Sequence, residues 1–115
     1  MLPKANRLLK KEDFQKAWKS GGSFYTKNLG FKLRKTTNTT LKLGVVVSNK
    51  ISKLATVRNK IKRQIREAVH SHLKNITPGG YDLVIIALPD ILKKPLEDIK
   101  KDVVIALNCF KILKK

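Results

Sequence analysis

The sequence from Lys50 to Glu67, KISKLATVRNKIKRQIRE, decides the fold, because it begins the clearest helical pattern in the chain. From Val57 to about Lys74, apolar residues recur at spacings of three and four, the period of a helix with one buried face. At about 100° per residue, Lys62 and Arg66 border this face. The apolar face comprises Ile61, Ile65, Ala68, Val69, His72 and Leu73, and the opposite side carries Asn59, Arg63, His70 and Lys74.

The predicted helix carries almost only positive charge. Glu67 is its single acid, although a solvated surface helix usually mixes charges of both signs. Opposite charges at i,i+4 stabilise a helix by about 0.2–0.5 kcal/mol, and like charges cost a similar amount. An anionic partner would relieve this repulsion. The alternative is a basic face that only keeps the protein in solution.

Length and net charge narrow the function. The 115 residues suffice for one domain with a modest core. The 26 Lys and Arg residues against 8 Asp and Glu residues give a formal charge of +18. Such a charge is typical of proteins that bind polyanions, and we expect a single RNA-binding domain over residues 1–115.

Other signals point away from membranes and from an oxidising compartment. No apolar run approaches the roughly 20 residues of a spanning helix, and no charged-then-apolar signal segment opens the chain. Cys109 is the only cysteine, without a CxxC or Cys/His companion, so neither an internal disulfide nor a zinc site is indicated. We expect a cytoplasmic protein with no membrane partner.

Two strands are predicted before the helix. Ser23 to Arg34 and Leu41 to Ser48 are expected to run antiparallel, joined by a polar turn. In the first, Phe31 and Leu33 alternate with basic residues, so one face is packed and the other is basic. In the second, the continuous run Val45–Val47 indicates a more central strand.

The remaining segments complete the expected fold. Residues 1–10 predict an extended basic arm that orders on binding, and residues 11–19 a short helix. Tyr81 to Leu88 predicts a buried strand, and Leu96 to Phe110 a final amphipathic helix with Pro95 near its start. The order α-β-β-α-β-α predicts an α/β two-layer sandwich, a small mixed sheet with helices on one side. Its strand-helix-strand crossover would be right-handed by default.

One motif in the predicted helix resembles a known family. An alanine, a short spacer and the spacing RNxxKRxxRE resemble the signature helix of the bacterial ribonuclease P protein subunit. The residues that carry this resemblance are Ala55, Val57, Arg58, Asn59, Lys62, Arg63, Arg66 and Glu67. It extends through Glu12–Phe14, Val47–Ser48 and Asp82–Ala87, and so covers most of the chain. The resemblance implies a left-handed crossover in place of the usual right-handed one.

The resemblance also implies a function. Proteins of this family are subunits of a ribonucleoprotein endonuclease that removes the 5′ leader of precursor tRNA. The implied partners are ribonuclease P RNA, in a 1:1 complex, and precursor tRNA, with no DNA partner. The catalytic RNA subunit is expected to carry the chemistry and to bind most of the Mg²⁺.

Two sets of site residues follow from the resemblance together with the helical pattern. The set expected to bind the precursor tRNA leader is Phe14, Trp18, Lys32, Arg58, Asn59, Lys62 and Arg66. The set expected to bind the RNA subunit is Lys50, Lys53, Lys60, Arg63 and His70. From the sequence alone, Phe14 and Trp18 fit a core role as well as a base-stacking one.

The chain departs from the family pattern at two positions. Lys32 stands where many relatives carry an aromatic residue that faces the leader cleft. Ala87-Leu88 stands where many relatives have Ala-Arg, which removes one expected cation. Neither change touches the signature helix.

Protein-borne catalysis is not indicated. The only close carboxylate set, Glu97, Asp98 and Asp102, falls in the first turns of the last predicted helix, where capping and compensation of the helix dipole are favoured. His70 and His72 would point about 200° apart on a helix and cannot share a metal. Two other functions stay open: a structural RNA-binding protein such as a ribosomal protein, and an autonomous nuclease with a metal-binding carboxylate cluster.

Overall fold

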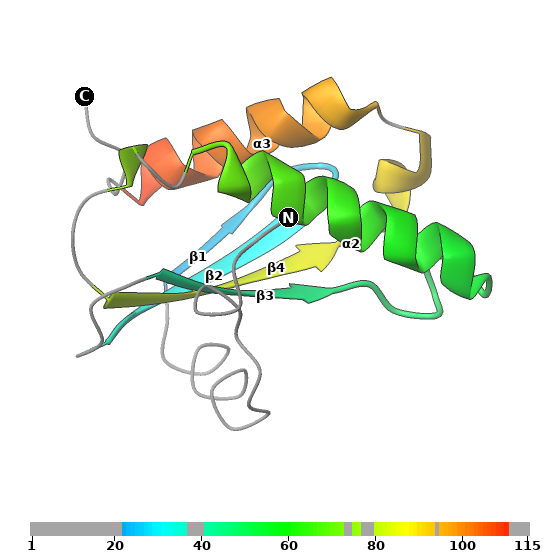
Figure 1. Cartoon of the computed structure of the whole chain (residues 1–115), viewed down its shortest axis with the longest axis horizontal. Helices are drawn as coiled ribbons and strands as arrows, with labels where there is room; N and C mark the ends of the chain where they lie inside the picture. Colours follow the sequence, from blue (N-terminus) through cyan, green and yellow to red (C-terminus); the bar gives the residue numbers. More distant parts are fainter. Residues whose placement is uncertain (1–21, 37–40, 73–74, 77–79, 94, 111–115) are drawn as a thin grey trace.

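The described residues form one sheet with two long helices on one face (Figure 1). The structure is a computed structural model, and it describes residues 22–36, 41–72, 75–76, 80–93 and 95–110. The predicted arm at residues 1–10 and the predicted helix at 11–19, with Phe14 and Trp18, lie outside the described residues.

The sheet is small and mixed, as predicted. Its strands are β1 (Gly22–Tyr25), β2 (Leu29–Thr36), β3 (Leu41–Val46) and β4 (Gly80–Ala87). They lie in the order β1-β2-β4-β3. The pairs β1–β2 and β2–β4 are antiparallel, whereas β3 and β4 are parallel.

Two helices, α2 (Ala55–His70) and α3 (Leu96–Cys109), cover the same face of the sheet and contact each other (Figure 1). A short 3₁₀ helix, η3 (Pro89–Lys93), joins β4 to α3 and was not predicted. Because α2 connects the parallel strands β3 and β4, the predicted strand-helix-strand crossover is present. Its left-handed sense stays a prediction.

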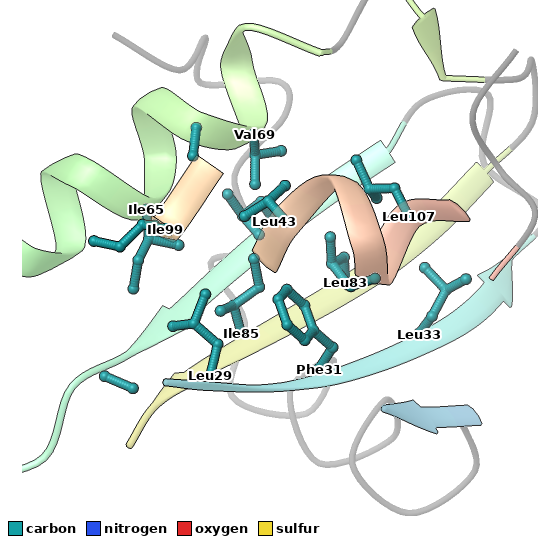
Figure 2. Packing of buried hydrophobic residues seen from close by; sticks show 14 of the residues in the cluster. Leu29, Phe31, Leu33, Leu43, Ile65, Val69, Leu83, Ile85, Ile99 and Leu107 are labelled. Carbon is teal, nitrogen blue, oxygen red and sulfur yellow. The ribbon is translucent and has the colours of Figure 1, made fainter. Parts of the chain in front are cut away.

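The core lies between the helices and the sheet. Leu29, Phe31 and Leu33 alternate along β2 and point toward the helices, so the predicted packed face of this segment is confirmed. Figure 2 shows the β-strand side chains meeting α2 and α3 through Ile65, Val69, Ile99 and Leu107. Each fully buried side chain of this kind contributes about 1.5–3 kcal/mol relative to an exposed one.

The prediction of a single strand over Ser23–Arg34 was wrong. The chain reverses at residues 26–28, which separates β1 from β2. Thr26 N–H donates to the carbonyl oxygen of Leu29 at 2.8 Å, and Thr26 Oγ1 accepts from the N–H groups of Asn28 and Leu29 at 3.2 and 3.0 Å. A hydroxyl that bonds nearby backbone groups favours a turn over an extended strand.

The predicted neighbours β2 and β3 run antiparallel, but they do not pair. β4 lies between them, because its run GYDLVIIA is buried along nearly its whole length and so belongs at the sheet centre. The prediction that Val45–Val47 lies in a central strand was also wrong. β3 is an edge strand, and Val46 is 38% exposed.

The signature helix is confirmed, but it ends earlier than expected. Ser71 Oγ donates to the carbonyl oxygen of Ala68 at 2.9 Å, and the N–H of His72 bonds the carbonyl of Val69 at 3.0 Å, a tighter spacing than that of an α-helix. His72 therefore lies in the turn after α2 and is half-buried, so its predicted place on the apolar helix face was wrong.

The last helix agrees with its prediction. Pro95 is the N-cap of α3, and Glu97 and Asp98 lie in its first turn. Cys109 ends this helix, and its thiol is free and exposed. Within the described ranges, no helix has the length and apolar character needed to cross a membrane.

Candidate nucleic-acid interface

The basic side of α2 is arranged as the sequence predicted. Ile61, Ile65, Ala68 and Val69 are buried against the core. Lys62 and Arg66 are half-buried at the border of this apolar face, whereas Asn59, Lys60 and Arg63 are exposed. The helix therefore presents a row of cations beside its packed face and a second group directed to solvent.

The beginning of α2 adds to this positive charge. Leu54 is the N-cap and makes no side-chain capping hydrogen bond, and the first turn contains no acidic residue. Backbone N–H groups at a helix start carry a partial positive charge that acids usually compensate. In α2 the helix dipole therefore acts in the same direction as the neighbouring Lys and Arg side chains.

Arg58 fixes the loop that precedes the helix. Its Nη1 donates to the carbonyl oxygens of Ser52 at 2.9 Å and Lys53 at 3.0 Å. The hydroxyl of Ser52 accepts from the N–H of Leu54 at 3.2 Å, which orders the same turn. Since a guanidinium has five N–H donors, this use of Nη1 leaves others for an anionic ligand.

Lys50, Lys53 and Arg58 come together around an open depression. It has a volume of about 510 Å³, and its fourth lining residue is Asn49. This volume falls within the range of ligand-binding clefts. The sequence prediction assigned Arg58 to the leader and the two lysines to the RNA subunit, but the structure places all three at one site.

The other predicted residues lie apart from this depression. His70 is half-buried at the far end of α2, twelve residues from Arg58, or about 18 Å along the helix axis. Lys32 lies in β2 between Phe31 and Leu33, which face the helices, so it points to the opposite side of the sheet from α2. We call this side, on which neither α2 nor α3 lies, the open face, although Gly30, Asp82 and Val84 on it are buried. Lys32 and the α2 residues therefore do not meet on one surface.

The open face also holds a partly buried ion pair that the sequence analysis did not predict. Arg34 Nη2 and Asp82 Oδ2 are 2.8 Å apart, with side chains 26% and 3% exposed. The two residues are direct neighbours across β2 and β4. The available signal was an acid inside the apolar run of β4, because buried charges in proteins are paired.

Among the described carboxylates, Asp102 has a structural role as well as Asp82. Asp102 Oδ2 accepts from Asn28 Nδ2 at 2.8 Å and from Thr26 Oγ1 at 3.0 Å, which ties α3 to the turn between β1 and β2. The sequence favoured capping and dipole compensation for Asp102, and the structure adds these two contacts outside its own helix. Among the described residues, no three His, Cys, Asp or Glu side chains are placed to hold a metal ion.

Comparison with known proteins shows the family to which this chain belongs. A family model described as Ribonuclease P matches residues 2–111 of the chain. The chain belongs to the ribonuclease P protein family. This confirms the resemblance inferred from the signature helix.

Individual ribonuclease P proteins match over most of their length. The ribonuclease P protein component of a Pseudanabaena species is 36% identical over 96 residues, which cover 83% of this chain and 81% of the relative. That of Brevibacillus brevis is 34% identical over 115 residues, which cover 99% and 90%. The structure of the Staphylococcus aureus protein is 29% identical with a TM-score of 0.86, covering 96% of this chain and 100% of that one. These matches confirm the predicted fold class.

Proposed function

We propose that this chain, as a ribonuclease P protein component, binds the catalytic RNA subunit and the 5′ leader of precursor tRNA. The observation that carries the proposal is the cluster of Lys50, Lys53 and Arg58 at the uncompensated N-terminus of α2, in a chain of this family. RNA is the polyanion that such a surface would bind in a ribonucleoprotein.

For the RNA subunit, the depression and the solvent-facing side of α2 both offer exposed cations. Lys50, Lys53, Lys60 and Arg63 are all exposed. Lysine neutralises phosphate as a point charge and arginine binds it through two parallel hydrogen bonds, so a mixed set favours backbone shape over base identity. His70 would extend this contact toward the end of the helix.

For the leader, Lys62 and Arg66 form the adjacent flank of α2, and the exposed Asn59 belongs to the same predicted set. Leader contacts exist in the precursor and are absent in the mature product, so they favour binding of substrate over product. Arg58 would serve both surfaces, because it lines the depression and begins this flank. Phe14 and Trp18 stay part of the predicted leader site.

Hydrolysis of the leader would be carried out by the RNA subunit with its Mg²⁺, which supplies the activated water. The role of this chain would be to bind and orient RNA. In support of this role, the carboxylates of Asp82 and Asp102 are both held by other side chains. The cytoplasmic location and the 1:1 stoichiometry are part of this proposal.

The test is cleavage of a 5′-extended precursor tRNA by a bacterial ribonuclease P RNA at low Mg²⁺, with and without the protein. We expect strong stimulation and a mature end that carries a 5′-phosphate, because neutralised phosphates reduce the Mg²⁺ that the RNA requires. Absence of stimulation with every compatible RNA would reject the proposal. Cleavage by the protein alone would instead indicate an autonomous nuclease.

A further inference from the structure

The open face of the sheet carries an exposed aromatic residue at its β1 edge. Tyr25 is 53% exposed, although it lies in a strand. Its neighbour Phe24 turns to the other side, where its ring lies 6.3 Å from that of the buried Phe31. Because side chains alternate along a strand, Tyr25 belongs to the open face.

The ring of Tyr25 rests against the backbone of Gly30, its partner in the β1–β2 register. A Cβ atom at position 30 would come within 2.7 Å of Tyr25 Cε1 and 2.9 Å of Cδ1. Glycine therefore lets the ring pack closely over β2. One side of the ring is supported by the sheet, while the rest is accessible to a ligand.

The surroundings of this ring are positively charged. Lys27 is exposed in the turn that follows β1. Lys32 lies two residues beyond Gly30 on β2, so it shares the open face with Tyr25. Diagonal neighbours of this kind in a sheet are about 7–8 Å apart, within reach of long side chains.

We propose that Tyr25 stacks on a base of single-stranded RNA, and this inference rests on the proposed function, in which the strand is the precursor tRNA leader. A ring supported on one side and bordered by cations has the two features that single-stranded nucleic acid needs, a stacking surface and charges for its phosphates. Lys32 supplies this face with a cation and no ring. Tyr25 supplies the ring from the neighbouring strand.

The favourable charge argues for RNA over a protein partner at this position. An apolar protein partner would leave the exposed amine of Lys27 to be desolvated without compensation, whereas a phosphate beside the stacked base would pair with it. The support from Gly30 also restricts the ring before binding, which reduces the entropy cost of ordering it.

The test uses the holoenzyme reconstituted from the full chain and a bacterial ribonuclease P RNA. Affinity is measured for a precursor tRNA with a single-stranded leader and for mature tRNA. The variants are Tyr25→Phe, which keeps the ring, and Tyr25→Leu, which keeps an apolar cover over Gly30 without a stacking surface. The matched control is Ile105→Ala, because Ile105 is 51% exposed on α3, away from the open face.

We expect Tyr25→Leu to weaken precursor binding by about 5- to 150-fold, the range that stacking of one base on an aromatic ring provides. Tyr25→Phe and Ile105→Ala should stay within about two-fold of the unaltered protein, and mature tRNA should be unaffected. Wild-type precursor affinity for Tyr25→Leu would overturn the inference. Equal losses for precursor and mature tRNA would also overturn it, because they would reflect a general defect.

Abasic substitutions along the leader provide a second readout. If Tyr25 stacks on one base, a single abasic position should reproduce the loss, and Tyr25→Leu should add nothing to it. If the affinity loss from Tyr25→Leu and the loss from an abasic substitution add in full at every leader position, direct stacking is contradicted. A holoenzyme that is stimulated by the protein but insensitive to Tyr25→Leu would reject this inference alone, whereas absence of stimulation would reject the proposed function itself.

Discussion

Two basic regions of this molecule, the N-terminal end of α2 with its loop and the open face of the sheet, use charge differently. At α2, Lys50, Lys53 and Arg58 surround a depression beside a helix start without acids. On the open face, Arg34 is held by the buried Asp82, and the accessible feature is the ring of Tyr25. The first region suits phosphate neutralisation, and the second suits contact with a base. A count of charges alone would not separate them.

The largest expected effect concerns the ion pair of the open face. Arg34→Met should destabilise the fold by about 3–5 kcal/mol, because it leaves the carboxylate of Asp82 buried without its partner. Asp82→Asn should cost less, because Arg34 is 26% exposed and can turn toward water. Urea unfolding of both variants measures the difference. Equal costs, or a larger cost for Asp82→Asn, would show that Asp82 is not the desolvated member of the pair.

The next effect concerns the depression. Replacing Lys50 and Lys53 together with Ala should weaken binding of the RNA subunit about ten-fold or more at physiological salt. The slope of log affinity against log salt should fall by about 1–2, because two phosphate contacts are lost. Replacing Lys100 and Lys101 on α3 with Ala is the matched control for lost charge. If the two double variants change the salt slope equally, binding depends on net charge alone, and the depression is not a specific RNA-binding site.

A smaller effect should separate the two roles of Arg58. Arg58→Lys keeps the charge but loses the guanidinium that holds two loop carbonyls, so the loop should present Lys50 and Lys53 less well. We expect RNA affinity to fall about three- to five-fold, and this loss to shrink when both lysines are already Ala, since residues at one site couple by about 0.5–3 kcal/mol. Additive losses in the combined variant would mean that Arg58 acts only as a separate phosphate contact.

The smallest effect concerns the open face. Gly30→Ala should displace the ring of Tyr25, since the new Cβ would come within 2.7 Å of it. We expect about two- to three-fold weaker precursor binding, and no further loss when position 25 is already Leu. If Gly30→Ala weakens precursor binding equally in the unaltered protein and in the Tyr25→Leu variant, Gly30 acts independently of Tyr25.

Local patterns predicted part of the fold well. The apolar period that includes Ile61 and Ile65 was sufficient for α2, because a helix closes its own hydrogen bonds over short distances. Sheet order was not predictable in the same way. The insertion of β4 between β2 and β3 depends on contacts between segments far apart in the sequence. The division of β1 from β2 likewise involves Asp102, which holds Thr26 and Asn28 from α3.

The candidate site was likewise predictable from the sequence only in part. The motif of α2 identified Arg58 and its neighbours, but their meeting with Lys50 and Lys53 required the loop conformation. Tyr25 was missed because one continuous strand over Ser23–Arg34 would place it on the same face as Phe31. The turn at residues 26–28 reverses the chain, so Tyr25 pairs with Gly30 and lies on the open face. A wrong strand boundary thus concealed the exposed ring.

We propose that this chain favours precursor over mature tRNA through leader contacts on α2. It is tested most directly by the affinity of the reconstituted holoenzyme for both RNAs, with the unaltered protein and with Lys62 and Arg66 both replaced by Ala. We expect the double variant to weaken precursor binding and to leave mature tRNA binding unchanged. Equal losses for the two RNAs would contradict it.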